Sequence, residues 1–196
     1  MEGASKARAS FTAEITIQSA HPVIESAAGK ADASALAASV TALGDHESLE
    51  PTAVAALVSE VEASIPAVQA AVAEADRIAA EAARAAEERI AALRSPAGAQ
   101  AYARDLMASQ YGWGADQASC LVNLWNKESN WRWDALNASS GATGIPQALP
   151  GSKMASHGAD WQTNPATQIS WGLDYIKRAY GTPCGAWAKS QSVGWY

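Results

Sequence analysis

The sequence predicts a mainly α-helical protein built from two chemically different parts. Alanine dominates the first 108 residues, and these residues also hold eleven of the twelve glutamates. All eight tryptophans lie between Trp113 and Trp195. The formal charge is −7 over residues 1–100 and +1 over residues 101–196. A chain divided this sharply has two parts with different roles.

We expect residues 1–30 to form an N-terminal tail. Residues 11–18 (FTAEITIQ) alternate between apolar and polar side chains, which is the period of a strand. No partner strand follows, and a docked or disordered tail is the alternative. The segment has no continuous apolar stretch, so it is not an intact secretory signal peptide.

Residues 31–98 predict an Ala-rich helical hairpin or coiled coil. Leu36, Val40 and Leu43 recur at helical spacing, and Pro51 fits the first turn of a new helix. A further helix is expected to start near Ser64, with Pro66 in its first turn, and to run to about residue 93.

This last helix carries an a/d seam of small side chains, with Ile, Val, Val and then four Ala at positions 65, 68, 72, 75, 79, 82 and 86. Small residues in such a seam suit closely approaching helices. The hairpin could therefore be a spacer, or it could bind a helical partner or associate with a second copy. Nothing in it has the residue chemistry of an active site.

Residues 99–196 predict short helices separated by long loops. The candidate helices cover residues 99–109, 115–128, 165–180 and 184–190. The loop before the third helix is rich in Gly, Ser, Asn and Pro, and it also contains three tryptophans. A long connection with large apolar residues inside a small domain is usually functional. We therefore expect the functional site in this loop.

Composition excludes several classes of function. No run of 18 apolar residues exists, so we expect no membrane-spanning segment. The net charge of −6 argues against non-specific nucleic-acid binding. Two cysteines, and only His157 after His46, argue against a zinc site. Neither a metal nor a cofactor is expected.

Glu128 is the candidate catalytic residue. It ends an apolar helix, and Trp125 and Trp131 beside it would partly desolvate its carboxyl group. Desolvation raises the pKa of a carboxyl group, which suits a general acid that protonates a glycosidic oxygen. The alternative is a surface glutamate paired with Lys127 or Arg132.

Two motifs around Glu128 carry a family resemblance. Glu128-Ser129-Asn130-Trp131, followed by SGATGIPQ at residues 140–147, resembles the lytic transglycosylase and goose-type lysozyme superfamily. The chain is most similar to transglycosylase-like domains of secreted actinobacterial proteins, and more distantly to resuscitation-promoting factors. The resemblance covers about residues 100–196.

Further short motifs extend the resemblance, and two departures limit it. The actinobacterial domains share the Gly-Ile-Pro-Gln form, YGW at residues 111–113, CGAW at 184–187 and GWY at 194–196. The broader family has Leu-Met in place of Ile145-Pro146. Its later Ala-Tyr-Asn-x-Gly motif is replaced by AWAKSQ at residues 186–191, so no catalytic role is carried over to that segment.

The resemblance implies a lysozyme-like domain that cleaves the β-1,4 bond between N-acetylmuramic acid and N-acetylglucosamine in peptidoglycan. By position, Glu128 matches the catalytic acid, Ser129 a residue that supports the site and contacts substrate, and Gly144 and Gln147 the cleft loop. A single glutamate would then give 1,6-anhydro products. A phage-type endolysin or muramidase on the same scaffold, or a non-catalytic glycan-binding adhesin, is the alternative.

Aromatic side chains are further candidates for the cleft, because sugar rings stack on them. We expect most tryptophans to fill the core and two or three to line the cleft, with Trp131 as the first choice and Trp161 as the second. Tyr175 aligns with a cleft aromatic of the family, although a core tyrosine is equally consistent with the sequence.

The resemblance also implies a secreted or cell wall-associated protein whose partners are peptidoglycan glycan strands. In an exported protein Cys120 and Cys184 would pair, closing a long loop. In the cytosol they would remain free thiols.

Overall fold

The computed structural model describes residues 2–196 and contains two compact units, which divide between Arg84 and Ala85. Helices dominate both units. The described residues hold no strand, and the β-type pairing among them is limited to isolated bridges from Leu136 to Thr143 and from Thr143 to Ala148. The predicted mainly α class is confirmed.

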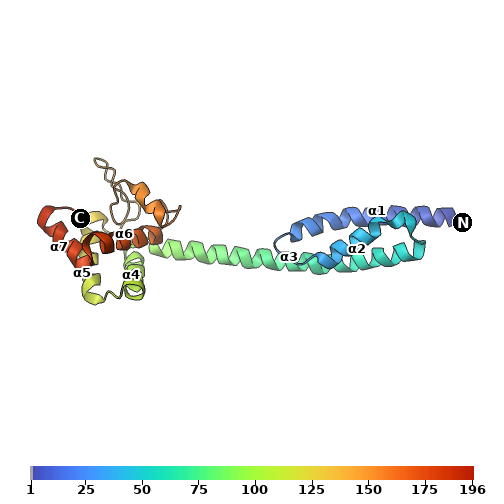
Figure 1. The fold of residues 1–196 in the computed structure, drawn as a ribbon, viewed down its shortest axis with the longest axis horizontal. Coiled ribbons are helices and arrows are strands. Elements are labelled where there is room, and N and C mark those ends of the chain that lie inside the picture. The colour runs from blue at the N-terminus through green and yellow to red at the C-terminus, as the bar shows by residue number, and fades with distance from the viewer. Residues whose placement is uncertain (1) are drawn as a thin grey trace. The chain divides into compact units, whose positions relative to one another are not determined.

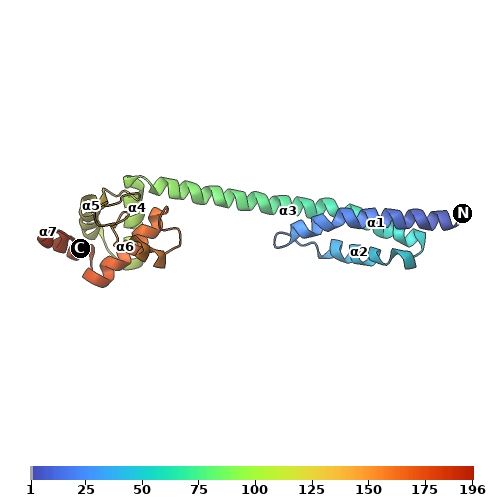
Figure 2. The ribbon, with the colours of Figure 1, turned by 90° about the horizontal axis from the view of Figure 1, so that it is seen from above.

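The first unit is formed by three long helices and a short 3-10 turn. These are α1 (Glu2–Ala27), α2 (Ser34–Gly44), η1 (His46–Ser48) and the first part of α3 (Pro51–Leu93). Figures 1 and 2 both show α1 and α2 alongside that part of α3. Their shared core consists of small and medium apolar side chains, among them Leu36, Leu43, Val54 and Val61.

The expectation of a tail with a strand-like segment at residues 1–30 is wrong, because α1 is helical and packs into this core. Its buried residues follow the helical spacing, at 13, 16, 20, 23 and 27. Phe11 and Ile15, which made the alternation look strand-like, stay 64% and 50% exposed. The apolar faces of α2 and α3 bury a helical set of small residues and thereby decide the secondary structure.

The helix break expected near Ser64 is also absent. Pro66 lies inside α3, with its ring exposed, while Val61 and Val68 on either side of it are buried. Proline in a helix interior costs about 3 kcal/mol. Burial of the flanking valines against α1 and α2 offsets that cost and keeps α3 continuous.

The a/d seam of α3 is only partly buried. Val68 and Val72 are buried in the first unit, whereas Ala79, Ala82 and Ala86 are exposed. By length and composition alone, α3 is the one described helix that could cross a membrane. Helices in the cores of other proteins meet the same criterion, so length and composition do not distinguish a membrane span from a core helix.

The second unit begins with the last turns of α3 and continues through α4 (Pro96–Leu106), a π-helical turn η2 (Met107–Tyr111), α5 (Ala115–Ser129), a 3-10 turn η3 (Gly151–Ser156), α6 (Pro165–Tyr180) and α7 (Pro183–Val193). The four helices predicted in this region are all present. Side-chain caps set the starts of α4, α6 and α7, because Ser95, Asn164 and Thr182 each accept a backbone N–H, and proline follows each of them.

The core of the second unit forms where α5 packs against α7, and where α6 packs against α4 and α7. Leu121, Leu124 and Trp125 of α5 are buried with Ile169 and Leu173 of α6. The predicted disulfide is confirmed, since Cys120 on α5 is bonded to Cys184 on α7, with 5.0 Å between their Cα atoms.

We expect the double variant Cys120→Ala/Cys184→Ala to lower the free energy of unfolding of the second unit by about 4 kcal/mol, because a 64-residue loop is released in the unfolded chain. Denaturant unfolding followed by tryptophan fluorescence measures this change in the second unit alone, since every tryptophan lies there. Reductant should lower the unfolding midpoint of the wild type and leave that of the double variant unchanged. Equal unfolding midpoints for the two proteins would contradict the prediction.

Candidate active site

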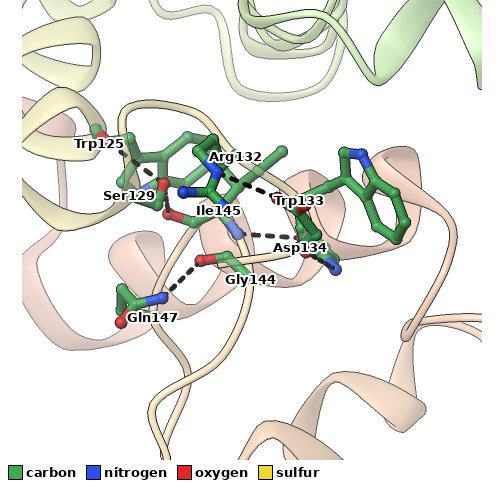
Figure 3. A network of polar contacts seen from close by, with 9 residues as sticks. Trp125, Ser129, Arg132, Trp133, Asp134, Gly144, Ile145 and Gln147 are labelled. Carbon is green, nitrogen blue, oxygen red and sulfur yellow. Dashed lines mark hydrogen bonds and ion pairs between the residues drawn. The ribbon is translucent and has the colours of Figure 1, made fainter. Parts of the chain in front are cut away.

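The two motifs singled out in the sequence meet at the C-terminal end of α5. Ser129 Oγ donates to the carbonyl of Ile145 at 2.8 Å, and it also lies 3.4 Å from the carbonyl of Trp125 (Figure 3). Ser129 is buried, so this contact is shielded from water. The hydroxyl group therefore fixes the segment 144–147 against the end of the helix.

The chain leaves α5 in a strained conformation. Asn130 and Trp131 both have left-handed backbone angles, with φ of 52° and 61°. Such angles are unfavourable for a bulky aromatic residue and persist only where the surroundings enforce them. Trp131 is 1% exposed, packs edge-on against Trp125 with ring centroids 5.0 Å apart, and donates its indole N–H to the Val122 carbonyl at 3.4 Å.

Gln168, on α6, organises the loop from its other side. Its Oε1 accepts the backbone N–H of Ile145 at 2.9 Å, and its Nε2 donates to the carbonyls of Trp133 at 3.0 Å and Trp161 at 2.9 Å. Gly144 makes this packing possible, because a Cβ there would lie 2.6 Å from Gln168 Oε1 and its φ is +76°. The amide is fully buried and all three of these hydrogen bonds go to backbone groups.

Tyr196 completes the connection between helix and loop. Its hydroxyl group accepts the indole N–H of Trp125 at 2.8 Å and donates to the Pro146 carbonyl at 2.9 Å. Burial raises the pKa of this phenol well above its usual value; the Trp125 hydrogen bond opposes part of that increase, and the nearby Glu128 adds a smaller one. The phenol therefore remains neutral and keeps both hydrogen bonds.

Glu128 is half-buried at the centre of these contacts, and no hydrogen bond or ion pair to its carboxylate occurs among residues 2–196. Burial raises its pKa, and the ammonium group of Lys127 opposes part of that increase. Lys127 itself binds the Ser190 hydroxyl at 2.8 Å and the Ser190 carbonyl at 2.9 Å, while Arg132 pairs with Asp134 at 3.1 Å. Both cations proposed as surface partners of Glu128 are therefore engaged elsewhere.

The carboxyl group faces a hollow of about 340 Å³. Its lining residues are Glu128, Ser129, Asn130, Arg132, Ala135, Leu136, Asn137 and Gln147. Gln147 also lines a second hollow of about 220 Å³, so this residue borders both hollows. Gln147 Nε2 donates to the Gly144 carbonyl at 2.9 Å (Figure 3), which fixes the amide at the junction.

The chain matches no protein-family model, no curated protein and no solved structure. The chemistry of the site therefore rests on its own geometry. A half-buried carboxyl group with a raised pKa and no protein partner can hold a proton and donate it to a bound group. No cluster of His, Cys, Asp or Glu that could hold a metal ion occurs in the described part of the chain.

The structure places four of the predicted site residues at the two hollows. Glu128 and Ser129 line the first, Gln147 lines both, and Tyr175 lines the second together with Trp171, Lys153 and Tyr196. Ser129 reaches the first hollow from a buried position, with its hydroxyl group already committed to Ile145.

The expectation that Trp131 lines the cleft is wrong in this structure. Its indole is buried against Trp125, because the left-handed turn after α5 directs it into the core. Trp161 lines neither hollow and instead packs with Ala148, Met154 and Trp171. Gly144 is also buried, and the close approach that it permits is to Gln168.

Sequence reasoning missed Gln168, Tyr196 and Lys153. Gln168 had a readable signal, since it is a polar residue on the same helical face as Ile169, Gly172 and Ile176. Tyr196 lay in the GWY motif of the resemblance and Lys153 in the loop expected to hold the site, but neither had a role assigned, because each meets its partners through residues that are distant in the sequence.

We expect Tyr196→Phe to lower the free energy of unfolding of the second unit by about 1–3 kcal/mol, because the Trp125 indole N–H and the Pro146 carbonyl lose their partner. Denaturant unfolding measures the change. Tyr102→Phe is the matched control, since Tyr102 is also half-buried but its hydroxyl group makes no hydrogen bond in the described chain. An equal loss of unfolding free energy in the two variants would show that the hydrogen bonds of Tyr196 contribute nothing to stability.

The raised pKa of Glu128 predicts a pH-dependent effect on stability. The folded pKa lies above the unfolded one, so ionisation of Glu128 destabilises the folded state as the pH rises through the folded pKa. Glu128→Gln should therefore be more stable than the wild type at about pH 8 and lose that advantage near about pH 4. Glu87→Gln, the same change at an exposed position, is the control. A stability difference independent of pH would contradict the assignment.

Proposed function

We propose that the second unit is a lysozyme-like domain that cleaves the β-1,4 bond between N-acetylmuramic acid and N-acetylglucosamine in peptidoglycan, with Glu128 as its general acid. The observation that carries this proposal is the half-buried Glu128 carboxyl group, which has a raised pKa and no partner in the described chain and lies at a hollow lined by residues of both motifs that carry the resemblance. A protonated carboxyl group is what departure of a glycosidic oxygen requires.

The other acids near the loop are already engaged. Asp134 pairs with Arg132 at 3.1 Å, and Asp174 pairs with Arg178 at 2.8 Å. Asp160 accepts hydrogen bonds from Asn164 and Thr167, both at 2.8 Å, which lower its pKa. None of the three lines the hollow at Glu128. A mechanism with two carboxylates would need a second acid there, so the arrangement favours a single glutamate.

In the proposed reaction Glu128 gives its proton to the glycosidic oxygen as the bond from C1 of muramic acid breaks. The resulting carboxylate takes the proton of the C6 hydroxyl group, and O6 bonds to C1. The products are a free hydroxyl end and a 1,6-anhydro sugar, no water is consumed, and Glu128 regains its proton. A muramidase on the same scaffold would bring water to C1 instead.

The residues around Glu128 support this role. Ser129, Gln168 and Tyr196 hold the segment 144–147 in place, so Gln147 is fixed beside the hollow, where its amide can bind sugar hydroxyl and acetamido groups. The disulfide suits an oxidising compartment. A secreted or cell wall-associated enzyme acting on glycan strands is consistent with both features.

We expect wild-type protein incubated with purified peptidoglycan to release 1,6-anhydro-muropeptides, and Glu128→Gln to lower the rate by about 10²- to 10⁴-fold, because the general acid is removed. Mass spectrometry of the soluble products gives both results. Asp105→Asn is the matched control, since it makes the same change at an exposed position on α4 that lines none of the hollows.

Two outcomes would contradict the lytic transglycosylase assignment. Reducing muropeptides from the wild type would show a muramidase with water as the acceptor. Retention of glycan by the wild type and by Glu128→Gln, without products from either, would show a glycan-binding protein that does not cleave.

A further inference from the structure

The hollows at Glu128 continue beyond Gln147. A third hollow of about 320 Å³ is lined by Lys153, Ser156, Trp171, Tyr175 and Arg178. It shares Lys153, Trp171 and Tyr175 with the second hollow, which in turn shares Gln147 with the first. Each of the three hollows thus shares lining residues with the next, from the one at Glu128 to the one at Lys153. We call the second and third together the distal hollows.

Lys153 is the unneutralised cation of the distal hollows. Its ammonium group makes no ion pair or hydrogen bond within the described chain, and only its backbone is engaged, through the Pro150 carbonyl and the Ser156 hydroxyl group. Arg178, the other cation there, is paired with Asp174 at 2.8 Å. The same Asp174 oxygen also lies 3.6 Å from the His157 ring. The positive charge left at the distal hollows therefore belongs to Lys153.

The position of Lys153 is set by a firm support. It lies on η3, whose Met154 is fully buried and clusters with Ala148 and Trp171. Gly151, at the start of η3, packs so closely that a Cβ there would lie 2.9 Å from Thr143 and 3.0 Å from Trp161. The backbone beneath Lys153 is thus anchored on two sides.

Beside Lys153 the wall of the distal hollows is aromatic. The rings of Trp171 and Tyr175 are stacked, with centroids 5.3 Å apart and an angle of 3° between planes. A ligand that fits this wall combines an apolar portion, which covers the rings, with an anionic group, which pairs with the ammonium group.

We propose that the distal hollows bind the peptide stem of the substrate and that Lys153 pairs with a stem carboxylate. This inference rests on the proposed function, since it assigns a second part of the same substrate to the same groove. The peptide stem, which is attached to muramic acid, supplies both required features. Its aliphatic side chains can cover the aromatic rings, and its free carboxylates can pair with the ammonium group. Lys153 would then make the enzyme prefer glycan that carries peptides.

The test compares cleavage of peptide-bearing strands with cleavage of strands freed of peptide by an amidase. We expect the wild type to favour the peptide-bearing strands by about tenfold in kcat/KM, the size of one charge-assisted hydrogen bond. Lys153→Met should bring that ratio close to one, and Lys153→Arg should keep most of it. Lys177→Met is the matched control, because Lys177 is exposed on α6 and lines none of the hollows. An unchanged ratio in Lys153→Met would overturn the inference.

A binding measurement separates this inference from the cleavage proposal. In the Glu128→Gln background, calorimetry compares a soluble disaccharide-peptide that has free carboxylates with the same compound after amidation. Tighter binding of the free acid that disappears with Lys153→Met supports the inference even where no protein cleaves. Cleavage without any dependence on Lys153 overturns the inference and leaves the proposed function in place. If the protein neither cleaves nor binds the substrate, both the inference and the proposed function are overturned.

Discussion

The position of the segment 144–147 depends on hydrogen bonds from side chains elsewhere in the unit. Its backbone lies in a long loop with little regular structure, and buried N–H and C=O groups need partners. Ser129, Gln168 and Tyr196 supply these partners from α5, from α6 and from the end of the chain. Because the three side chains arrive from separate parts of the fold, the segment is fixed only when the whole unit is assembled. The position of Gln147 beside Glu128 follows from these contacts.

The same arrangement leaves the Glu128 carboxyl group without a hydrogen-bond or ion-pair partner among residues 2–196. Its nearest cation, Lys127, is held by carbonyl and hydroxyl oxygens near the C-terminus of α7, and Arg132 is held by Asp134. Burial therefore acts on the carboxyl group with little compensation and favours its protonated form. Such a group lowers the stability of the fold but gives the site a proton donor, and functional positions commonly show this trade-off.

The two units are stabilised in different ways. The first buries a helical set of alanines, valines and leucines, so its core is made of small side chains on long helices. The second has short helices and a long loop, and it relies on buried tryptophans, a disulfide and side chains bonded to the backbone. This difference explains why all the chemistry of the candidate site lies in the second unit. Helix α3 belongs partly to each, and its alanine seam is exposed at Ala79, Ala82 and Ala86.

The sequence by itself determined the features that depend on local signals. The helices expected at residues 115–128 and 165–180 are α5 and α6, and apolar side chains of α5 form its buried face as expected. The prediction that Glu128 would be partly desolvated was also local, because its tryptophan neighbours are close in sequence. Only the tertiary structure decided burial where it depends on surfaces contributed by distant segments. That is why α1 is a helix, why Pro66 does not end α3, why Trp131 lies in the core, and why Gln168 and Tyr196 support the site.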